Sequence, residues 1–358
     1  MDNRAIEQLI SVRIIQEDAE AIYSLMISEN DPVFVMEVLP YYALFVQSCA
    51  EFLGGGILTK QIAAEIKDIR NYIKVYSDSF GTSKKRIVSI DSEQDEVARA
   101  YLKYDFLKNW NIHLNLGTYW SEDGHVVGNT QQISDFLNIK DASNLEVKEE
   151  IHVLAQQVAS FVVSIRAAFA EIIEPPKISR KMSGIPIKKY YDINTNRQEK
   201  LFKKTTRKEL NLFLLHLLSN INFVNYVLRE CFSEHNLWLF RVEYISTYYT
   251  FRALYRLYNY CENNELKEID LFSLRELLST GEQLFKSEFR SCMMHYGLEG
   301  RDILQEEHIE KPFYGIIEAC FPGLNYEAYL HLLRRFSASL TSYIEQFFDC
   351  SGIELKDL

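Results

Sequence analysis

The chain has 358 residues, a formal net charge of −11, 47% hydrophobic residues and 25% charged residues. These values are normal for a soluble globular protein of one or two domains, and the negative charge argues against a protein that coats nucleic acid without selection. The six cysteines are scattered without a C-x-x-C pair, which indicates reduced thiols and no metal site. We therefore expect a cytoplasmic protein without a metal or other cofactor.

The first half of the chain has the apolar periodicity of helices. Residues 33–58 form the most apolar run, but Glu37, Pro40 and Glu51 interrupt it, so we expect a buried helical segment and no contact with a membrane. The N-terminal residues predict a charged amphipathic helix and not a signal peptide. Helices are predicted over residues 4–28, 58–77, 92–110 and 145–173, with breaks at 30–32, 54–56 and 77–85.

One segment of this half departs from the helical pattern. Residues 111–129 alternate polar and apolar side chains on both sides of Asp123-Gly124. This pattern is typical of two strands joined by a tight turn. We expect a small β-hairpin here.

A basic stretch follows at residues 176–210. It contains 11 Lys and Arg against 3 Asp and Glu, a local balance of 11 − 3 = +8. With two prolines, a glycine and little periodicity, residues 176–204 predict a linker between an N-terminal domain of unknown role (1–175) and a C-terminal domain (205–358). A solvated linker and a cationic segment that binds a polyanion are both compatible with this composition.

The second half predicts a helical bundle. Long apolar helices are expected over residues 210–232, 237–260 and 325–348, and a further helix from Ser273 to the region of Gly297. Capping boxes that start at Thr206 and Ser273 predict the beginnings of two of them. The fold class is therefore all-α, a C-terminal helical bundle preceded by a mostly helical region with a small hairpin.

Three arginines precede a histidine by five to seven positions: Arg290/His295, Arg229/His235 and Arg301/His308. The last two pairs lie beside glutamates and predict solvated helix ends or connectors. Arg290 and His295 are instead expected in the last two turns of a bundle helix. Five positions on an ideal helix separate two side chains by roughly 140°, so they converge only if the helix loosens or a second copy of the chain faces the first.

The chemistry of this pair has two interpretations. A histidine that exchanges a proton near neutral pH can drive attack of a ribose 2′-hydroxyl on the adjacent phosphate. An arginine can hold that phosphate and stabilise the charge on its oxygens without a metal. Alternatively, Arg290 forms a surface ion pair and His295 is an exposed residue at a helix end, neither of them with a catalytic role.

The stretch FRSCMMHYG around this pair resembles the HEPN superfamily, whose signature is Arg, four to six residues, then His, often with a polar residue after the arginine. Ser291 stands at that polar position, where asparagine or aspartate is commoner. The resemblance covers residues 205–358 at most. It implies a dimeric helical bundle in which His295 is the general acid and base, Arg290 stabilises the phosphate and Ser291 is an accessory group.

Many members of this superfamily are metal-independent RNases in toxin–antitoxin and phage defence, and others are inactive interaction modules. One toxin group has a tyrosine two residues after the histidine that a partner nucleotidyltransferase modifies; here Tyr296 follows the histidine directly. The resemblance thus implies an RNA substrate, a homodimer, and an antitoxin or other regulatory protein as partner.

Three functions follow as hypotheses. The first is a HEPN-type endoribonuclease that acts through Arg290 and His295. The second is a non-catalytic helical scaffold, which the acidic charge and the 22 Tyr and 22 Phe favour. The third is a nucleotide-binding sensor in which Arg290 binds phosphate without breaking a bond.

Overall fold

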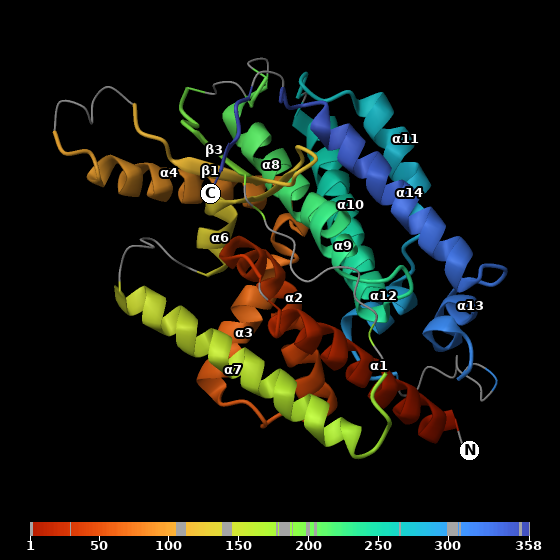
Figure 1. Ribbon diagram of the computed structural model, residues 1–358. Coiled ribbons are helices and arrows are strands. Elements are labelled where there is room, and N and C mark those ends of the chain that lie inside the picture. The colour runs from red at the N-terminus through yellow and green to blue at the C-terminus, as the bar shows by residue number, and fades with distance from the viewer. Residues whose placement is uncertain are drawn as a thin grey trace.

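The computed structural model shows a mostly helical protein with one small antiparallel sheet (Figure 1). The predicted mostly helical fold and the hairpin are confirmed. The structure describes residues 3–28, 30–104, 112–137, 145–176, 178, 187, 189–197, 201–203, 206–264, 266–298, 307, 309–350 and 353–357.

The helices of the first half begin at side chains that accept backbone N–H groups. Asp31, Thr59 and Ser79 cap the second, third and fourth helices in this way. Because the fourth helix begins directly after Ser79, the break between helices is shorter than the predicted 77–85. The helix predicted over 92–110 runs instead from Phe80 to Ala100. The elements are α1 (Asn3–Met26), α2 (Pro32–Phe52), α3 (Lys60–Tyr72), the 3-10 turn η1 (Val75–Ser77), α4 (Phe80–Ala100), α6 (Thr130–Phe136) and α7 (Leu145–Ala170).

The sheet joins three distant parts of the chain in the order β2-β1-β3-β4. Strands β1 (Leu116–Trp120) and β2 (Val126–Asn129) form the predicted hairpin, with Gly124 at a positive φ of 83° in its turn. Strand β3 (Lys189–Ile193) pairs with β1 and lies within the predicted linker. Strand β4 (Lys356–Asp357) pairs with β3 at the edge of the sheet. Part of the basic stretch therefore has regular structure, which the sequence did not predict.

The second half contains the predicted long helices. They are α8 (Lys208–Asn222), which continues through the π-helical turn η2 (Phe223–Leu228) into α9 (Arg229–Cys231), then α10 (Leu237–Asn264), α11 (Leu271–Glu282), α12 (Ser287–Met294), the 3-10 turn η4 (Pro312–Gly315), α13 (Ile316–Cys320) and α14 (Tyr326–Glu345). In Figure 1, α10 lies beside α11 and α14, and the three pack together.

Both predicted capping boxes are wrong. Helix α8 is preceded by Arg207, which makes no side-chain cap, and Thr206 lies outside it. Helix α11 starts at Leu271 because Asp270 accepts the N–H groups of the two residues that follow Leu271, so Ser273 is already helical. A stronger cap three residues upstream thus overrides the capping box.

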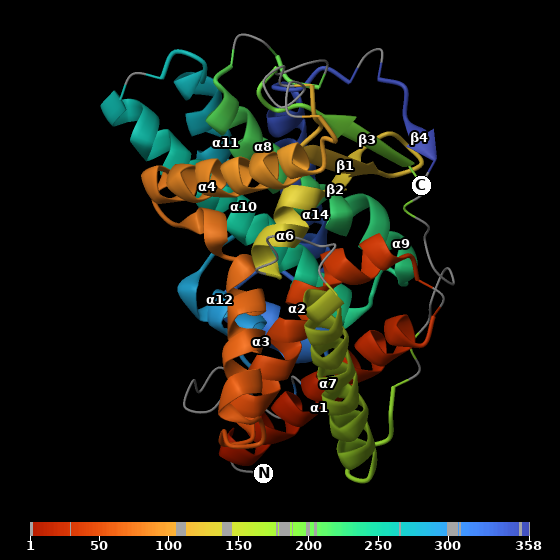
Figure 2. The same cartoon turned by 90° about the vertical axis from the view of Figure 1, so that its left-hand side faces the viewer.

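The buried apolar side chains form one continuous cluster that draws on residues from both sides of the basic stretch. Helix α1 packs against α7 on the outer side and against α10 on the inner side, and Figures 1 and 2 show α1 and α7 side by side at the lower edge of the molecule. The division into independent domains at 176–204 stays a prediction.

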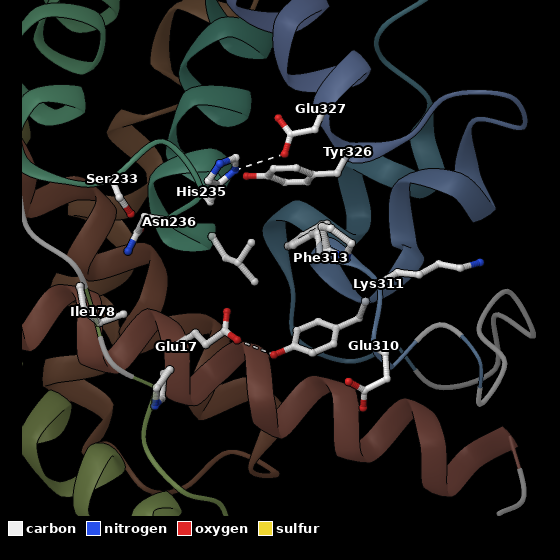
Figure 3. A pocket seen from close by; sticks show the side chains of 14 residues that line it. Glu17, Ile178, Ser233, His235, Asn236, Glu310, Lys311, Phe313, Tyr326 and Glu327 are labelled. Carbon is white, nitrogen blue, oxygen red and sulfur yellow. Dashed lines mark hydrogen bonds and ion pairs between the residues drawn. The ribbon is translucent and has the colours of Figure 1, made fainter.

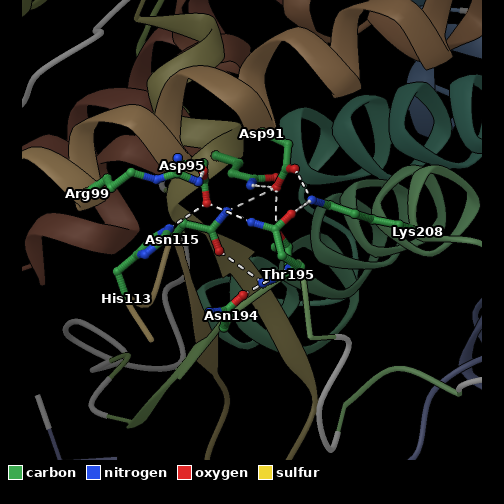
Figure 4. Close-up of polar contacts among 10 residues, drawn as sticks. Asp91, Asp95, Arg99, His113, Asn115, Asn194, Thr195 and Lys208 are labelled. Atoms are coloured by element: carbon green, nitrogen blue, oxygen red, sulfur yellow. Dashed lines mark hydrogen bonds and ion pairs between the residues drawn. The ribbon is translucent and has the colours of Figure 1, made fainter. Parts of the chain in front are cut away.

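A buried polar network fixes the sheet to the helices around Asp91 of α4 (Figure 4). Its Oδ1 accepts hydrogen bonds from Thr195 at 2.7 Å, Gln131 at 2.8 Å and Asn115 at 3.3 Å, and its Oδ2 is ion-paired with Lys208 at the start of α8. The carboxylate is therefore fully satisfied by residues of four different segments. We interpret this cluster as structural.

Three helical segments of the described chain are long and apolar enough, by length and composition, to cross a membrane: Pro32–Phe52, Ile151–Ala170 and Lys208–Cys231. The first and third are 83% buried within the fold, as predicted for the first, whereas the second is only 33% buried. Helix α7 therefore presents apolar side chains at the surface. The absence of membrane contact and the cytoplasmic location stay predictions.

Candidate functional site

The predicted site residues lie on α12 and directly after it. Arg290 and Ser291 belong to this helix, whereas His295 follows its last residue, Met294. The prediction that one helix from Ser273 carries all three is wrong, because the chain leaves the helical conformation at residues 283–286 and α12 is a separate helix of eight residues.

The end of α12 changes the direction of the histidine. His295 has an extended backbone with φ −134° and ψ 150°, so the separation of 140° expected on a continuous helix no longer applies. Its Nδ1 lies 3.3 Å from Oε2 of Glu51 in the last turn of α2, and both side chains are about half exposed. Ser291 is half-buried, and its carbonyl oxygen accepts the backbone N–H of His295 at 3.0 Å.

Arg290 belongs to a group of positive charges at the same surface. Its guanidinium carbon is 6.0 Å from the ring centre of Tyr248, and its side chain is exposed. The pKa of Lys74 is lowered to about 8, chiefly by burial and then by the charges of Arg70, Arg290 and Lys67, while the negative charge of Glu51 opposes this shift. Because the charges of both Arg290 and Glu51 act on Lys74, we infer that Arg290 and the Glu51–His295 pair lie in one surface region.

Arg70 has an unused hydrogen-bond donor at this region. The residue is only 7% exposed, its Nη1 donates to Asn71 at 3.4 Å, and its buried Nε has no hydrogen-bond partner. Burial lowers the pKa of the guanidinium, and the charge of Glu51 opposes this. A buried guanidinium with an unsatisfied N–H is unfavourable by itself.

The backbone that carries His295 is held by the helices beneath it. The final carbonyl groups of a helix have no partner within that helix. Here Arg241 of α10 donates to the carbonyl of Met293 at 2.8 and 3.2 Å, and Ser48 of α2 donates to the carbonyl of Met294 at 2.8 Å. The position of His295 is thus fixed by side chains from both halves of the chain.

Tyr296 is part of the same support. It is 2% exposed, and its hydroxyl donates to Oδ2 of Asp18 at 2.6 Å. Asp18 is also ion-paired with Arg241, whose guanidinium carbon lies 4.4 Å from the centre of the Tyr296 ring. Burial raises the pKa of Asp18, and these two partners oppose the shift. The phenol is therefore enclosed, which leaves no access for a modifying enzyme in this conformation.

The Arg229/His235 pair does not form such a group. Arg229 donates to the buried Glu243 at 2.6 Å and to Asn225 at 2.8 Å. His235 lies 3.2 Å from Glu327 on a different element. Arg301 and His308 lie outside the described residues.

Three basic side chains in the described part of the basic stretch form ion pairs with carboxylates of the protein. Lys189 pairs with Asp357 at 2.7 Å and Arg207 with Glu268 at 2.7 Å, and Lys208 binds the buried Asp91 network. These three charges are therefore neutralised within the protein. These three ion pairs do not include Arg197, Lys203 or the basic residues outside the described part. Binding of a polyanion by the stretch therefore stays a prediction.

Comparison of the chain with protein-family models, with curated proteins and with solved structures finds no match. The assignment of the candidate site therefore rests on its geometry and not on a known relative. Among the described residues, no group of three or more His, Cys, Asp or Glu is arranged to hold a metal ion, and the expectation of a metal-independent protein stays a prediction.

Sequence reasoning missed Glu51, Arg70 and Lys74. They lie more than 200 positions before Arg290 in helical or turn segments where charged surface residues are ordinary. The one available signal was the interruption of the apolar run by Glu51.

Proposed function

We propose that the protein is a metal-independent endoribonuclease of the HEPN type, with Arg290 and His295 as its catalytic residues and a homodimer as its working form. The observation that carries this proposal is the grouping of Arg290, Arg70 and Lys74 beside the His295–Glu51 pair. Positive charge for a phosphodiester and an imidazole for its ribose hydroxyl are thereby available at one surface. The proposal includes an antitoxin or other regulatory protein as partner, in keeping with the resemblance.

The positive groups would bind the phosphate. Arg290 is exposed and reaches solvent, whereas Arg70 lies beneath the surface and contributes its positive charge from there. A guanidinium on each non-bridging oxygen stabilises the charge that builds up when a fifth oxygen approaches phosphorus. The polar side chain of Ser291 is assigned an accessory role next to Arg290.

The histidine would move the proton. With Nδ1–H donating to Glu51, the neutral imidazole has its acceptor at Nε2, and the carboxylate stabilises the imidazolium that forms. Nε2 takes the proton of the 2′-hydroxyl, the O2′–P bond forms and the P–O5′ bond breaks. Lys74, with a pKa of about 8, is mostly an ammonium at neutral pH and would supply the proton that the leaving 5′ oxygen takes. The products are a 2′,3′-cyclic phosphate and a 5′-hydroxyl.

The test is cleavage of a single-stranded RNA by the purified protein in the presence of EDTA, with the chemical ends of the products identified. We expect cyclic-phosphate ends, and a loss of about 100-fold or more in rate for His295→Ala and for Arg290→Ala. His331→Ala, which removes an exposed histidine of α14, is the matched control and should cleave like the wild type. Undiminished cleavage by His295→Ala would refute the site.

A second candidate is the non-catalytic scaffold, and the exposed side of α7 favours it. Val153 and Val163 on this helix are 49% and 44% exposed, and Ile172 just after it is 69% exposed. Under this function, Val153→Asp with Val163→Asp would abolish co-purification of a protein partner from the source cells. His295→Ala would then change neither that interaction nor RNA integrity.

A further inference from the structure

A cavity is present whose lining does not include Arg290 or His295. It has a volume of about 450 Å³ and is lined by Glu17 of α1, the segment that precedes α10, the turn η4 and the start of α14 (Figure 3). This volume is in the range of sites for small molecules.

Glu17 is one of the acidic residues that line this cavity. Its Oε1 accepts the hydroxyl of Tyr314 at 2.5 Å. Burial raises its pKa to about 7, the negative charge of Asp18 adds to this, and the hydrogen bond from Tyr314 and the charge of Arg13 oppose it. No lysine or arginine of the described chain forms an ion pair with Glu17. Among the described residues, the carboxyl group thus has no lysine or arginine in direct contact, and the charge of Arg13 acts on it from a longer distance.

The other charged groups leave the cavity with an excess of carboxylates. The ammonium of Lys311 lies 3.8 Å from Glu307 and points away from the cavity in Figure 3. His235 is 3.2 Å from Glu327, so these two side chains compensate each other when the imidazole is protonated. Glu310 also lines the cavity. The excess of carboxylates around the cavity therefore favours a positively charged ligand.

The walls of the cavity are aromatic and rigid. Phe313 and Tyr326 line it, and each packs against the buried ring of Phe240 with ring centres 5.2 Å apart. Tyr326 is 2% exposed, and its hydroxyl is buried without a hydrogen-bond partner. Figure 3 shows this hydroxyl pointing toward the neighbouring His235. A buried hydroxyl without a partner is unfavourable.

The turn that places the aromatic rings has an uncommon backbone. Phe313 has φ 48° and Tyr314 has φ 53°, and Gly315 follows with φ 66°. A left-handed conformation costs a non-glycine residue on the order of 1–2 kcal/mol. Strain of this kind concentrates at binding sites. Here it directs the hydroxyl of Tyr314 to Glu17.

We propose that this cavity binds a small alkylammonium ligand, such as a diamine or polyamine, with its ammonium group on Glu17 and its methylene chain against Phe313 and Tyr314. The carboxylate supplies the opposite charge, and the aromatic faces attract a cation and cover its apolar chain. The inference is independent of the proposed nuclease activity, because it concerns a separate cavity and is tested by binding alone.

The test is isothermal titration of the full-length protein with putrescine and with spermidine at pH 8. We expect saturable binding of at least one of them, and none of 1,4-butanediol, which has the same carbon chain without charge. Glu17→Gln should weaken the binding at least tenfold, whereas Glu122→Gln, at an exposed position of the hairpin turn, should leave it unchanged. Absence of binding by both amines, or equal binding by Glu17→Gln, would overturn the proposal.

The pH dependence of the wild type is a second measurement that needs no variant. The amines stay protonated from pH 6 to pH 8, while Glu17 ionises through its pKa of about 7. The ionised fraction rises from about one tenth to about nine tenths, so the affinity should increase about tenfold between these pH values. An affinity that is constant over this range would also overturn the assignment to Glu17.

Discussion

Glu37 is a buried carboxyl group whose ionisation should control the stability of the protein. It lies on α2 and is 5% exposed. Its side chain covers Gly128 and accepts the backbone N–H of Asn129, while its Oε1 has no hydrogen-bond partner. Burial raises the pKa of this group from 4.5 to about 8. The substitution Glu37→Gln tests this role, because glutamine has nearly the shape of glutamate but no ionisable carboxyl group.

The expected effect follows from the proton that the folded state retains. Between pH 4.5 and pH 8 the unfolded chain has lost the proton of Glu37, and the folded chain keeps it. The folded state of the wild type therefore loses stability as the pH rises through this window, by about 1.4 kcal/mol per pH unit. The loss reaches about 3 kcal/mol at pH 7, compared with about 1 kcal/mol at pH 5. Glutamine has no such dependence.

The assay is urea unfolding of both proteins at pH 5, 6 and 7. We expect the free energy of unfolding of Glu37→Gln, relative to that of the wild type, to increase by about 2 to 3 kcal/mol over this range. The exposed Glu122→Gln serves as the control and should show no pH-dependent difference. A difference between Glu37→Gln and the wild type that stays constant from pH 5 to pH 7 would refute the reasoning.

Three further changes test other parts of the structure. Gly281→Ala would place a methyl group 2.3 Å from the ring of Phe336, and this overpacking should outweigh the better helix propensity and destabilise the protein by about 1–3 kcal/mol in urea unfolding. Tyr296→Phe removes the hydrogen bond to Asp18 and should lower the free energy of unfolding by about 1.5–3 kcal/mol; an unchanged value would show that the bond contributes nothing. Because the pKa of Lys74 is about 8, its positive charge is lost as the pH rises through 8, so RNA binding measured by fluorescence anisotropy should weaken between pH 7 and pH 9 in the wild type and stay level in Lys74→Met.

Much of the helical fold could be predicted because its signals are local. The apolar periodicity of α1, α7, α10 and α14 is contained in each segment, and the turn of the hairpin is marked by Asp123-Gly124. Strand β3 could not be found in this way. Its residues are mostly half-buried without an alternating apolar pattern, and its hydrogen bonds go to β1, about 70 positions earlier. A strand that depends on distant partners has little signature of its own.

The candidate site was predictable only in the part that is contiguous in sequence. Arg290 and His295 were selected from their spacing and their expected place at the end of a bundle helix. The extended backbone at His295 was not predicted, because it depends on what holds the end of α12. That support is Arg241 on the carbonyl of Met293 and Asp18 on Tyr296. A buried arginine of α10 and a buried aspartate of α1 look in the sequence like surface residues of amphipathic helices.

These contacts lead to an expectation for the isolated C-terminal region. A fragment of residues 205–358 would lack Asp18, so Arg241 would be buried without its ionic partner, and removal of one partner of a buried pair costs about 3–5 kcal/mol. The same cut exposes the face of α10 that packs against α1. We therefore expect the fragment to be unfolded or aggregated by circular dichroism and size-exclusion chromatography. If it is instead folded, monodisperse and as active on RNA as the full chain, the first half is not needed to position His295, and the roles of Glu51, Arg70 and Lys74 in the site are excluded with it.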